Sequence, residues 1–198
     1  MNLQTSGRNL SAHSSSDPTA TSSWNVQQSG ARRQDKAPDL HVVLVHPEIP
    51  GNTGTIARTC AATAIGLHLV KPLGFEIDST RLKRAGLDYW DYVVVKVHDD
   101  WQELLKYFQE LPGPKRMHAF TKFATQSYSL PGTYQHGDWL LFGAETTGLP
   151  AEVRKDALAS GGAELKIPIQ ETHVRSLNLA VAASVALYEG VRQLDPDM

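Results

Sequence analysis

Short apolar runs recur along the chain from residue 40 onward, and each has the length of a β-strand. The first, LHVVLV, from Leu40 to Val45, is almost continuously apolar, which is typical of a strand buried on both faces of a sheet. YVVVKV, from Tyr92 to Val97, is rich in the β-branched residues that favour strands. The segments LHLV, MHAFT, WLLFG and AELKIPI have similar patterns, so we expect several strands.

Helix-like stretches separate these strands. Asn52 is the predicted N-cap of TGTIARTCAATAIG, because its side chain can accept a hydrogen bond from the first turn. WQELLKYFQEL is expected to be capped by Asp99 or Asp100 and to stop at Pro112–Gly113. A last helix is expected from Ser176 to Gln193. The alternation of strands and helices predicts an α/β fold, with a mostly parallel sheet and helices on both faces.

The first 38 residues differ in composition from the rest. The stretch SSSDPTATSS, from Ser14 to Ser23, has almost no apolar periodicity, so it cannot bury enough surface to offset the entropy of ordering. We therefore predict a disordered tail over residues 1–38 and one folded domain over residues 39–198. The tail lacks the apolar segment of a secretory signal. An organellar transit peptide is the alternative, since Arg8, Arg32 and Arg33 outnumber the acidic residues before Asp35.

Composition narrows the possible functions. The net charge is −2 with neutral histidines, so any RNA binding has to come from local motifs rather than from a basic balance. Cys60 is the only cysteine, which excludes a disulfide within the chain and a cysteine zinc cluster, and suits a reducing compartment. The sequence has no run of 18 apolar residues and no HxxxH spacing. We therefore expect a cytoplasmic protein with no membrane span and no metal.

The first candidate motif is PEIPGNTGTIAR, from Pro47 to Arg58, which joins the first strand to a helix. Ligands of open α/β sheets bind at the carboxyl ends of the strands, and Gly51 and Gly54 permit close approach of the backbone. Arg58, six residues after the predicted cap, is expected on the second helical turn, where it could grip a phosphate. The alternative is a capped helix with an ordinary surface arginine.

The second motif is LLFGAETTGLP, from Leu140 to Pro150, in which an apolar strand ends in a glycine-containing loop. Glu145 is the only charged residue of this loop. It is expected either to cap a turn or to fix a functional arginine by a charge-assisted hydrogen bond. The loop is not a GxGxxG sequence, and the chain has no Walker loop, which disfavours a nucleotide-binding protein of unrelated function.

The third motif is KIPIQETHVRSLNLAVAASVALYE, from Lys166 to Glu189, where a strand and a polar loop lead into the last helix. Ser176 and Asn178 are both favoured at helix starts, so one interpretation is that they only cap. The other is that their side chains and the nearby amides face a bound ligand. Small residues along the helix predict close packing, either in the core or against a second subunit.

In this order and at these strand ends, the three motifs resemble those of the SPOUT superfamily of RNA methyltransferases. The chain is most similar to the tRNA wobble-nucleotide 2'-O-methyltransferases of the TrmL (YibK) type. The similarity includes VKPLGFEIDSTRLKRAGLDYW and the ending SVALYEGVRQL, and it covers about Leu40 to Leu194. The resemblance implies a deep trefoil knot in the C-terminal part, S-adenosyl-L-methionine as the methyl donor, and a homodimer that acts on tRNA.

The resemblance also implies roles for individual residues. The methyl donor is expected to contact Phe120, Gly143, Ile167, Ser176 and Leu177, and loop amides and carbonyls would read its adenine edge. Arg58 matches the catalytic arginine, and Glu145 and Asn178 match further catalytic positions that orient Arg58 or the substrate. Since a guanidinium keeps its proton with a pKa above about 12, Arg58 is expected to hold the adjacent phosphate and align the 2'-oxygen rather than to act as a general base.

The RNA-binding candidates are Arg81, Lys83 and Arg84, beside Tyr89 and Trp90, because positive charge with flanking aromatics suits a phosphate backbone and unstacked bases. A solvated helix face is the alternative. The implied activity is 2'-O-methylation of nucleotide 34, a cytidine or a modified uridine, in leucine tRNA isoacceptors. Two other functions remain open: methylation of another tRNA or rRNA site, and a non-catalytic RNA-binding dimer.

Overall fold

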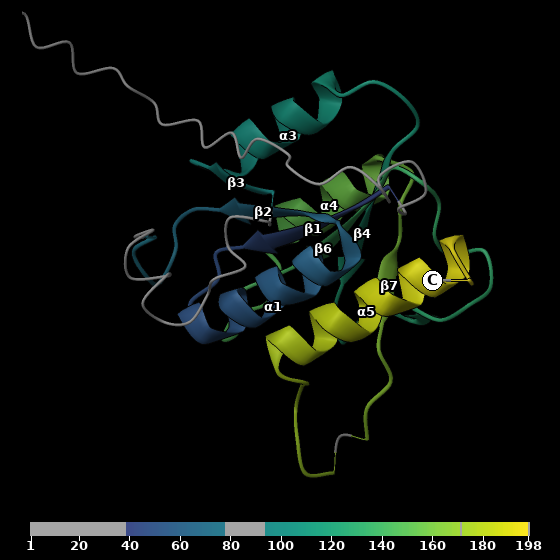
Figure 1. Ribbon diagram of the computed structural model, residues 1–198. Coiled ribbons are helices and arrows are strands. Elements are labelled where there is room, and N and C mark those ends of the chain that lie inside the picture. The colour runs from purple at the N-terminus through teal and green to yellow at the C-terminus, as the bar shows by residue number, and fades with distance from the viewer. Residues whose placement is uncertain (1–38, 78–93, 171, 198) are drawn as a thin grey trace, which may run out of the picture.

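A computed structural model of the protein describes residues 39–77, 94–170 and 172–197, so the predicted tail over residues 1–38 lies outside it. Its centre is a seven-stranded sheet with the order β3-β2-β1-β6-β4-β7-β5, in which all the paired strands are parallel (Figure 1). The strands are β1 (Leu40–Val45), β2 (Gly66–Val70), β3 (Val95–His98), β4 (Arg116–Phe120), β5 (Gln126–Ser127), β6 (Asp138–Phe142) and β7 (Glu164–Lys166). The predicted α/β fold with a mostly parallel sheet is confirmed.

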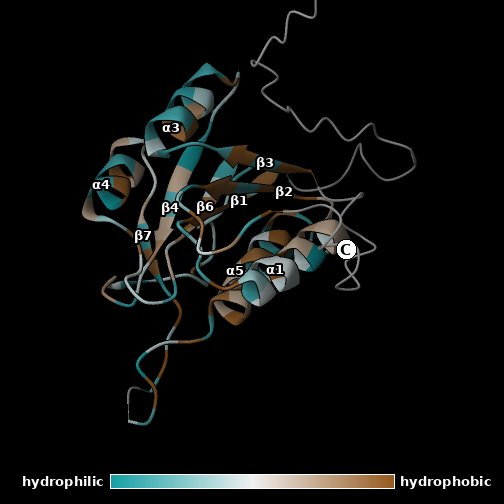
Figure 2. Cartoon of the chain, turned by 90° about the vertical axis from the view of Figure 1, so that its left-hand side faces the viewer, coloured by the Kyte–Doolittle hydropathy of each residue, from teal (hydrophilic) through white to brown (hydrophobic). Residues whose placement is uncertain are grey.

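Helices cover both faces of this sheet, as predicted. One face carries α1 (Pro50–Thr63) and α5 (Leu179–Leu194), which lie side by side; the other carries α3 (Trp101–Glu110) and α4 (Ala151–Ala159) (Figures 1 and 2). None of the helices within the described ranges combines the length and the apolar character needed to cross a membrane.

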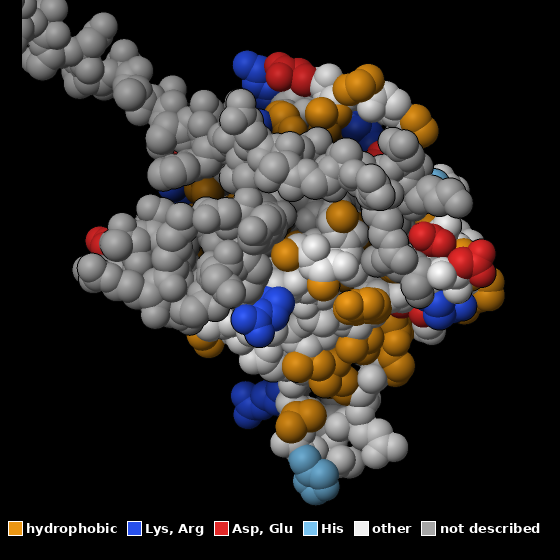
Figure 3. All heavy atoms as spheres, viewed as in Figure 1, with side chains coloured by type: hydrophobic (Ala, Val, Ile, Leu, Met, Phe, Trp, Pro, Cys, Tyr) orange, Lys and Arg blue, Asp and Glu red, His pale blue; other side chains and the backbone are white. Residues whose placement is uncertain are grey.

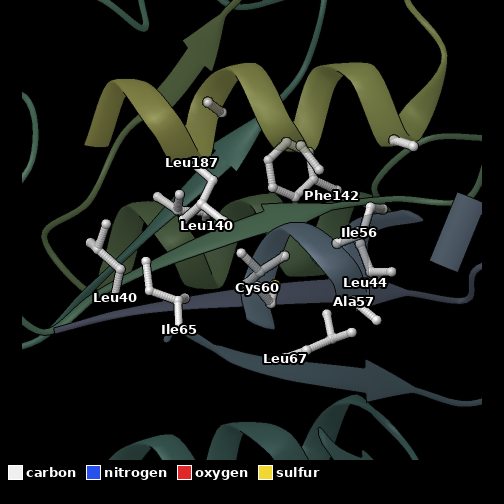
Figure 4. Packing of buried hydrophobic residues seen from close by; sticks show 14 of the residues in the cluster. Leu40, Leu44, Ile56, Ala57, Cys60, Ile65, Leu67, Leu140, Phe142 and Leu187 are labelled. Atoms are coloured by element: carbon white, nitrogen blue, oxygen red, sulfur yellow. The ribbon is translucent and has the colours of Figure 1, made fainter. Parts of the chain in front are cut away.

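The interior strand β1 is buried on both faces, which explains its continuous apolar sequence. Leu44 belongs to the core cluster beneath α1 and α5, whereas its neighbour Val43 belongs to the cluster beneath α3 and α4. This alternation is the two-residue period of a strand. In the first cluster, Ile56 of α1 lies beside Leu44, and Leu187 of α5 lies beside Leu140 (Figure 4).

The last helix buries its small residues in the core, in agreement with the predicted close packing. Ala180, Ala183 and Ala186 are all buried. The Oγ1 of Thr59 in α1 lies 3.0 Å from the Oγ of Ser184 in α5, so a hydrogen bond joins the two helices. The pairing of α1 with α5 holds the first and third sequence motifs against each other.

The start of α1 differs from the prediction. The helix begins at Pro50, and Ile49 is at the N-cap position without a side-chain hydrogen bond. Asn52 is therefore not the N-cap, because a proline at the first helical position starts the helix three residues earlier than predicted. As a consequence, Arg58 lies on the third turn of α1 rather than on the second. In α3, Asp100 is the cap, and its carboxylate accepts a hydrogen bond from the backbone N–H of Glu103.

Other boundaries also shift. The AELKIPI segment contributes only Glu164–Lys166 to the sheet, and the last helix begins at Leu179 instead of Ser176. The sequence did not predict α4 or the two-residue strand β5. α4 buries only Val153 and Ala157, so its amphipathic pattern is weak.

Three histidines, one each from β1, β2 and β3, form a hydrogen-bonded row on the sheet face that α3 covers. The Nδ1 of His41 lies 3.1 Å from the Nε2 of His68, and the Nδ1 of His68 lies 3.0 Å from the Nε2 of His98. Their rings pack with Trp139 of β6 and Tyr107 of α3. Burial, the largest cause in each case, lowers the pKa of all three imidazoles; that of His98 falls to about 4.

Candidate active site

Two of the three motifs leave the sheet side by side. β1 and β6 are parallel neighbours with Leu44 opposite Phe142, so the loops that follow them emerge at the same edge. Glu145, in the loop after β6, reaches the segment after β1. Its carboxylate accepts hydrogen bonds from the backbone N–H of Glu48 at 2.8 Å and of Ile49 at 3.3 Å. Glu145 therefore satisfies backbone donors at the entrance to α1, where no side chain of the segment itself caps the helix.

Asn52 connects this carboxylate to the last helix. Its Nδ2 donates to the Oε1 of Glu145 at 2.9 Å, and its Oδ1 accepts from the Nδ2 of Asn178 at 2.9 Å. Asn178 is the N-cap of α5, since its Oδ1 accepts from the backbone N–H groups of Ala180 and Val181. A continuous hydrogen-bonded path thus runs from Glu145 through Asn52 to Asn178 and joins all three motifs.

The environment of Glu145 keeps its carboxylate ionised. Partial burial on its own would raise the pKa of this carboxyl group, but the hydrogen bonds from Asn52 and from the amides of Glu48 and Ile49 outweigh that effect and hold the pKa below its usual value. A carboxylate with a lowered pKa is a weak base and a strong hydrogen-bond acceptor. It is suited to hold donors in place rather than to remove a proton.

The loop of the second motif is folded tightly on itself. Ala144 pairs with Gly148, whose backbone has a φ of 70°, a value that glycine adopts readily. A Cβ atom on Gly143 would collide with the backbone of Gly148 and Leu149. Position 143 therefore requires glycine, and only its backbone atoms are available to a ligand.

The expected methyl-donor residues lie mostly at one edge of the sheet. Phe120 ends β4, Gly143 follows β6 and Ile167 follows β7, and β4 is the parallel neighbour of both other strands. The ring of Phe120 stacks on Phe142 with centroids 4.7 Å apart. The two remaining candidates, Ser176 and Leu177, are in the loop before α5, where Ser176 is exposed and Leu177 is half-buried. The register thus brings Phe120, Gly143 and Ile167 together.

The basic candidates have different outcomes. Arg58 is on an exposed position of α1. Arg81, Lys83 and Arg84 lie outside the described residues, as do Tyr89 and Trp90.

Sequence reasoning missed the role of Asn52 as a link between motifs. An asparagine beside a helix start is read first as a cap, and no local pattern reveals partners 93 and 126 residues away.

No group of three or more histidine, cysteine, aspartate or glutamate side chains within the described ranges is arranged to hold a metal ion. Glu145 and Asn178 meet at this edge through Asn52, whereas Arg58 lies farther along α1, on its third turn. This edge offers an ionised hydrogen-bond acceptor and loop backbone, which suits the binding and alignment of reactants.

Comparisons with known proteins agree with the resemblance seen in the sequence. The SpoU rRNA Methylase family model matches residues 39–188. A tRNA (cytidine(34)-2'-O)-methyltransferase of Yersinia pestis is 47% identical over 156 residues, covering 78% of this chain and 94% of that protein. The corresponding protein of Escherichia coli K12 is 45% identical over 155 residues, again with 78% and 94% coverage.

Solved structures give the same result. A structure described as giving insights into 2'-OH methylation of C/U34 on tRNA is 48% identical, with a TM-score of 0.70, covering 81% of this chain and 99% of that one. An rRNA methyltransferase from Sinorhizobium meliloti with bound S-adenosylmethionine is 26% identical, with a TM-score of 0.66, covering 85% and 62%. With most of its residues matched by one family model and nearly the full length of its relatives aligned, this chain belongs to the SpoU rRNA Methylase family.

Proposed function

We propose that this protein transfers a methyl group from S-adenosyl-L-methionine to the ribose 2'-hydroxyl of the wobble nucleotide, position 34, of tRNA. Relatives 45–47% identical to the chain carry this activity in their names and align over 94% of their length. The observation that carries the proposal is the path Glu145–Asn52–Asn178, because it unites three motifs at one sheet edge. We further propose leucine tRNAs with a cytidine or a modified uridine at position 34 as the substrates.

The strand-end residues fit the methyl donor. Phe120, Ile167 and Leu177 offer apolar contacts, and Gly143 offers only backbone hydrogen-bonding groups, a combination suited to a neutral adenosine moiety. Ser176 adds an exposed hydroxyl in the loop before α5. The bound donor supplies an already activated methyl group, so the main tasks of the protein are to bind and orient the reactants.

Arg58 is proposed to hold the phosphate next to the reacting ribose and so to align the 2'-oxygen. A guanidinium is unsuited to act as a general base, because its pKa is above about 12. Glu145 and Asn178 are proposed to be positioning residues, which fix the loop after β6 and the start of α5 without contacting the reacting atoms. The described bonds of Glu145 support this division, because both of its carboxylate oxygens accept hydrogen bonds from the segment that leads into α1.

We propose that the C-terminal part of the chain forms a deep trefoil knot. The support is topological: β7 lies between β4 and β5, which are joined by residues 121–125 alone. A later strand inserted between two closely connected earlier strands requires the chain to pass an existing loop. Such threading is rare among protein folds.

We also propose a homodimer formed through the outer faces of α1 and α5. Figure 3 shows hydrophobic side chains gathered over α5, and among the exposed apolar residues are Ile49, Val181 and Tyr188. Exposed apolar patches mark interaction sites in soluble proteins. Val181→Glu is expected to shift the mass measured by light scattering from dimer to monomer, and an unchanged mass would place the interface elsewhere.

A tRNA substrate and a single buried thiol, Cys60, also suit the expected cytoplasmic location.

The deciding experiment is methyl transfer from labelled S-adenosyl-L-methionine to total tRNA and, in a parallel reaction, to rRNA, followed by nucleoside mapping. Label on the ribose of nucleotide 34 supports the proposal and identifies the isoacceptors. Label at another tRNA position or in rRNA would keep the reaction and replace the target. Absence of transfer to either RNA by protein that binds the methyl donor would leave a non-catalytic RNA-binding protein as the better description.

A further inference from the structure

Phe123 is the most exposed large hydrophobic side chain among the described residues, with 74% of its surface accessible. It lies in the turn that follows β4. An isolated exposed apolar side chain needs no special explanation, but a ring held so far out of the core on a fixed turn presents a flat apolar surface to solvent.

The turn that carries Phe123 is anchored on both sides. The backbone N–H of Thr121 donates to the carbonyl of Leu165 in β7 at 3.0 Å. The hydroxyl of Thr121 accepts from the backbone N–H of Phe123 at 3.3 Å, and the carbonyl of Thr121 accepts from the N–H of Ala124 at 3.3 Å. Ala124 is buried. Because the turn is already ordered, binding of a ligand to this ring costs little conformational entropy of the protein.

A positive charge and a hollow adjoin the ring. The Nζ of Lys122 lies 5.3 Å from the centroid of the Phe123 ring. The hollow has a volume of about 440 Å³ and is lined by residues 123–126, Leu158 and residues 162–164. Its size is that of a small-ligand site, and Leu158 adds a second exposed apolar side chain to it.

The ring is close to the edge where we place methyl transfer. Phe123 follows Phe120 by three residues, so their Cα atoms are at most about 11 Å apart. Phe120 is itself stacked on Phe142, the residue that precedes Gly143. A nucleotide that receives the methyl group from a donor bound at Gly143 and Ile167 therefore lies within a few nucleotide lengths of the ring.

We propose that Lys122 and Phe123 form a nucleotide subsite, in which the Phe123 ring stacks on an unpaired base near the methylated nucleotide and Lys122 contacts a backbone phosphate. The subsite rests on the proposed function, because its occupant is the anticodon loop of the tRNA substrate. An aromatic face beside a cation matches single-stranded RNA, whose bases stack and whose phosphates are negative. An apolar contact with a second copy of the chain would not use the lysine.

The test compares variants for methyl transfer and for binding of a fluorescent anticodon stem-loop RNA. Phe123→Ala is expected to raise KM for tRNA and Kd for the stem-loop roughly tenfold, the effect of losing one stacked base. Maximal turnover and affinity for the methyl donor are expected to be unchanged, and Phe123→Trp is expected to restore affinity. Lys122→Ala is expected to reduce the slope of log affinity against log salt by about 0.7, as for one lost phosphate contact. Leu130→Ala, at another exposed leucine, is the matched control.

Unchanged KM and Kd in Phe123→Ala would overturn the subsite. A change of oligomeric state in that variant, with RNA affinity intact, would overturn it in favour of a contact between copies. If the unaltered protein binds the stem-loop without methylating tRNA, the proposed function fails, and the Phe123→Ala effect on Kd still decides the subsite. If the unaltered protein methylates tRNA and Phe123→Ala behaves identically, only the subsite fails.

Discussion

Asn52 and Glu145 are 93 residues apart in the sequence, and a hydrogen bond of 2.9 Å joins their side chains. The same asparagine accepts a hydrogen bond from Asn178, so its two amide atoms serve two different loops. An amide can do this because it combines a donor and an acceptor on one planar group. The helix that carries Arg58 is in this way tied to both of the loops expected to contact the methyl donor.

Replacement of the Glu145 carboxylate tests this tie. In Glu145→Gln, an NH₂ group faces backbone N–H donors, and at least one of them loses its acceptor. The free energy of unfolding is expected to fall by about 1–3 kcal/mol. Methyl transfer is expected to fall by about a hundredfold, because misplaced reactants react slowly. Urea unfolding and transfer assays measure the two effects, with Glu152→Gln on the exposed side of α4 as the control. Wild-type rates in Glu145→Gln would show that the tie is not needed for the reaction.

Arg58 is expected to be needed for transfer but not for binding of the methyl donor. Arg58→Ala removes the proposed phosphate contact, so methyl transfer should be lost while the calorimetric Kd for S-adenosyl-L-methionine stays within about twofold of the original. Arg58→Lys keeps the charge without the planar fork and should recover only part of the rate. Lys106→Ala, at an exposed position of α3, is the charge-matched control. Full activity in Arg58→Ala would remove this residue from the reaction.

Gly143→Ala is expected to open the loop of the second motif. The added Cβ meets the backbone of Gly148 and Leu149, which have no flexible side-chain end to move aside. Overpacking of this kind costs about 1–3 kcal/mol, and we expect the Kd for the methyl donor to rise roughly tenfold. Gly51→Ala, where an added Cβ meets nothing within 4 Å, should retain stability and donor affinity. Equal donor affinity in both variants would contradict a backbone contact at Gly143.

The histidine row should make the fold sensitive to mild acid. Because His41, His68 and His98 have lowered pKa values in the folded protein, the unfolded chain binds more protons than the folded chain between pH 6.5 and about 4. The free energy of unfolding is therefore at its full value above pH 6.5 and falls as the pH drops through this range. Each histidine contributes a slope of up to about 1.4 kcal/mol per pH unit.

Urea unfolding at a series of pH values measures this slope. His98→Phe removes one titrating group and should make the slope shallower between pH 6.5 and about 4. Leu130→Ala, at an exposed position without a titrating group, should leave the slope as it was. A free energy that does not change with pH in the unaltered protein would mean that the row titrates alike in the folded and unfolded states.

Asp138 is expected to matter for stability alone. This buried carboxylate at the start of β6 accepts hydrogen bonds from Arg116 and His118. Burial would raise its pKa, but these partners outweigh burial and lower it. Asp138→Asn leaves the Arg116 charge without its counterion, so the unfolding free energy should fall by about 3–5 kcal/mol. Affinity for the methyl donor, measured well below the melting temperature, should be retained. Asp138 starts β6, whereas Gly143 follows the other end of the same strand. Loss of donor binding in folded protein would contradict this separation.

The apolar runs predicted the sheet because a buried parallel strand has a local signature. Leu40–Val45 is the clearest case, with side chains in both core clusters. α4 has no such signature, since it buries only two residues and is held by its neighbours. Asp100 was one of two predicted caps, and the choice between it and Asp99 depends on backbone angles that composition does not encode.

The candidate site was predicted in part for a similar reason. Gly143 and Asn178 are at positions where local chemistry matters, a tight loop and a helix start, and the sequence motifs mark both. The role of Asn52 depends on partners from two distant loops, so local reading assigned it to a cap. Phe123 follows a strand with no feature that distinguishes a buried ring from an exposed one, and only the turn at Thr121 determines its direction.

The position of β7 between β4 and β5 has a consequence for synthesis on the ribosome. β4 and β5 leave the exit tunnel before the residues that must separate them, so the nascent chain cannot complete this half of the sheet in the order in which it is made. Residues 116–127 can take their places in the sheet only after Glu164–Lys166 have been synthesised. The hydrogen bond between Asn178 and Asn52 forms later still. A nascent chain that ends before α5 therefore lacks the completed site, and methyl transfer begins only after α5 has been synthesised.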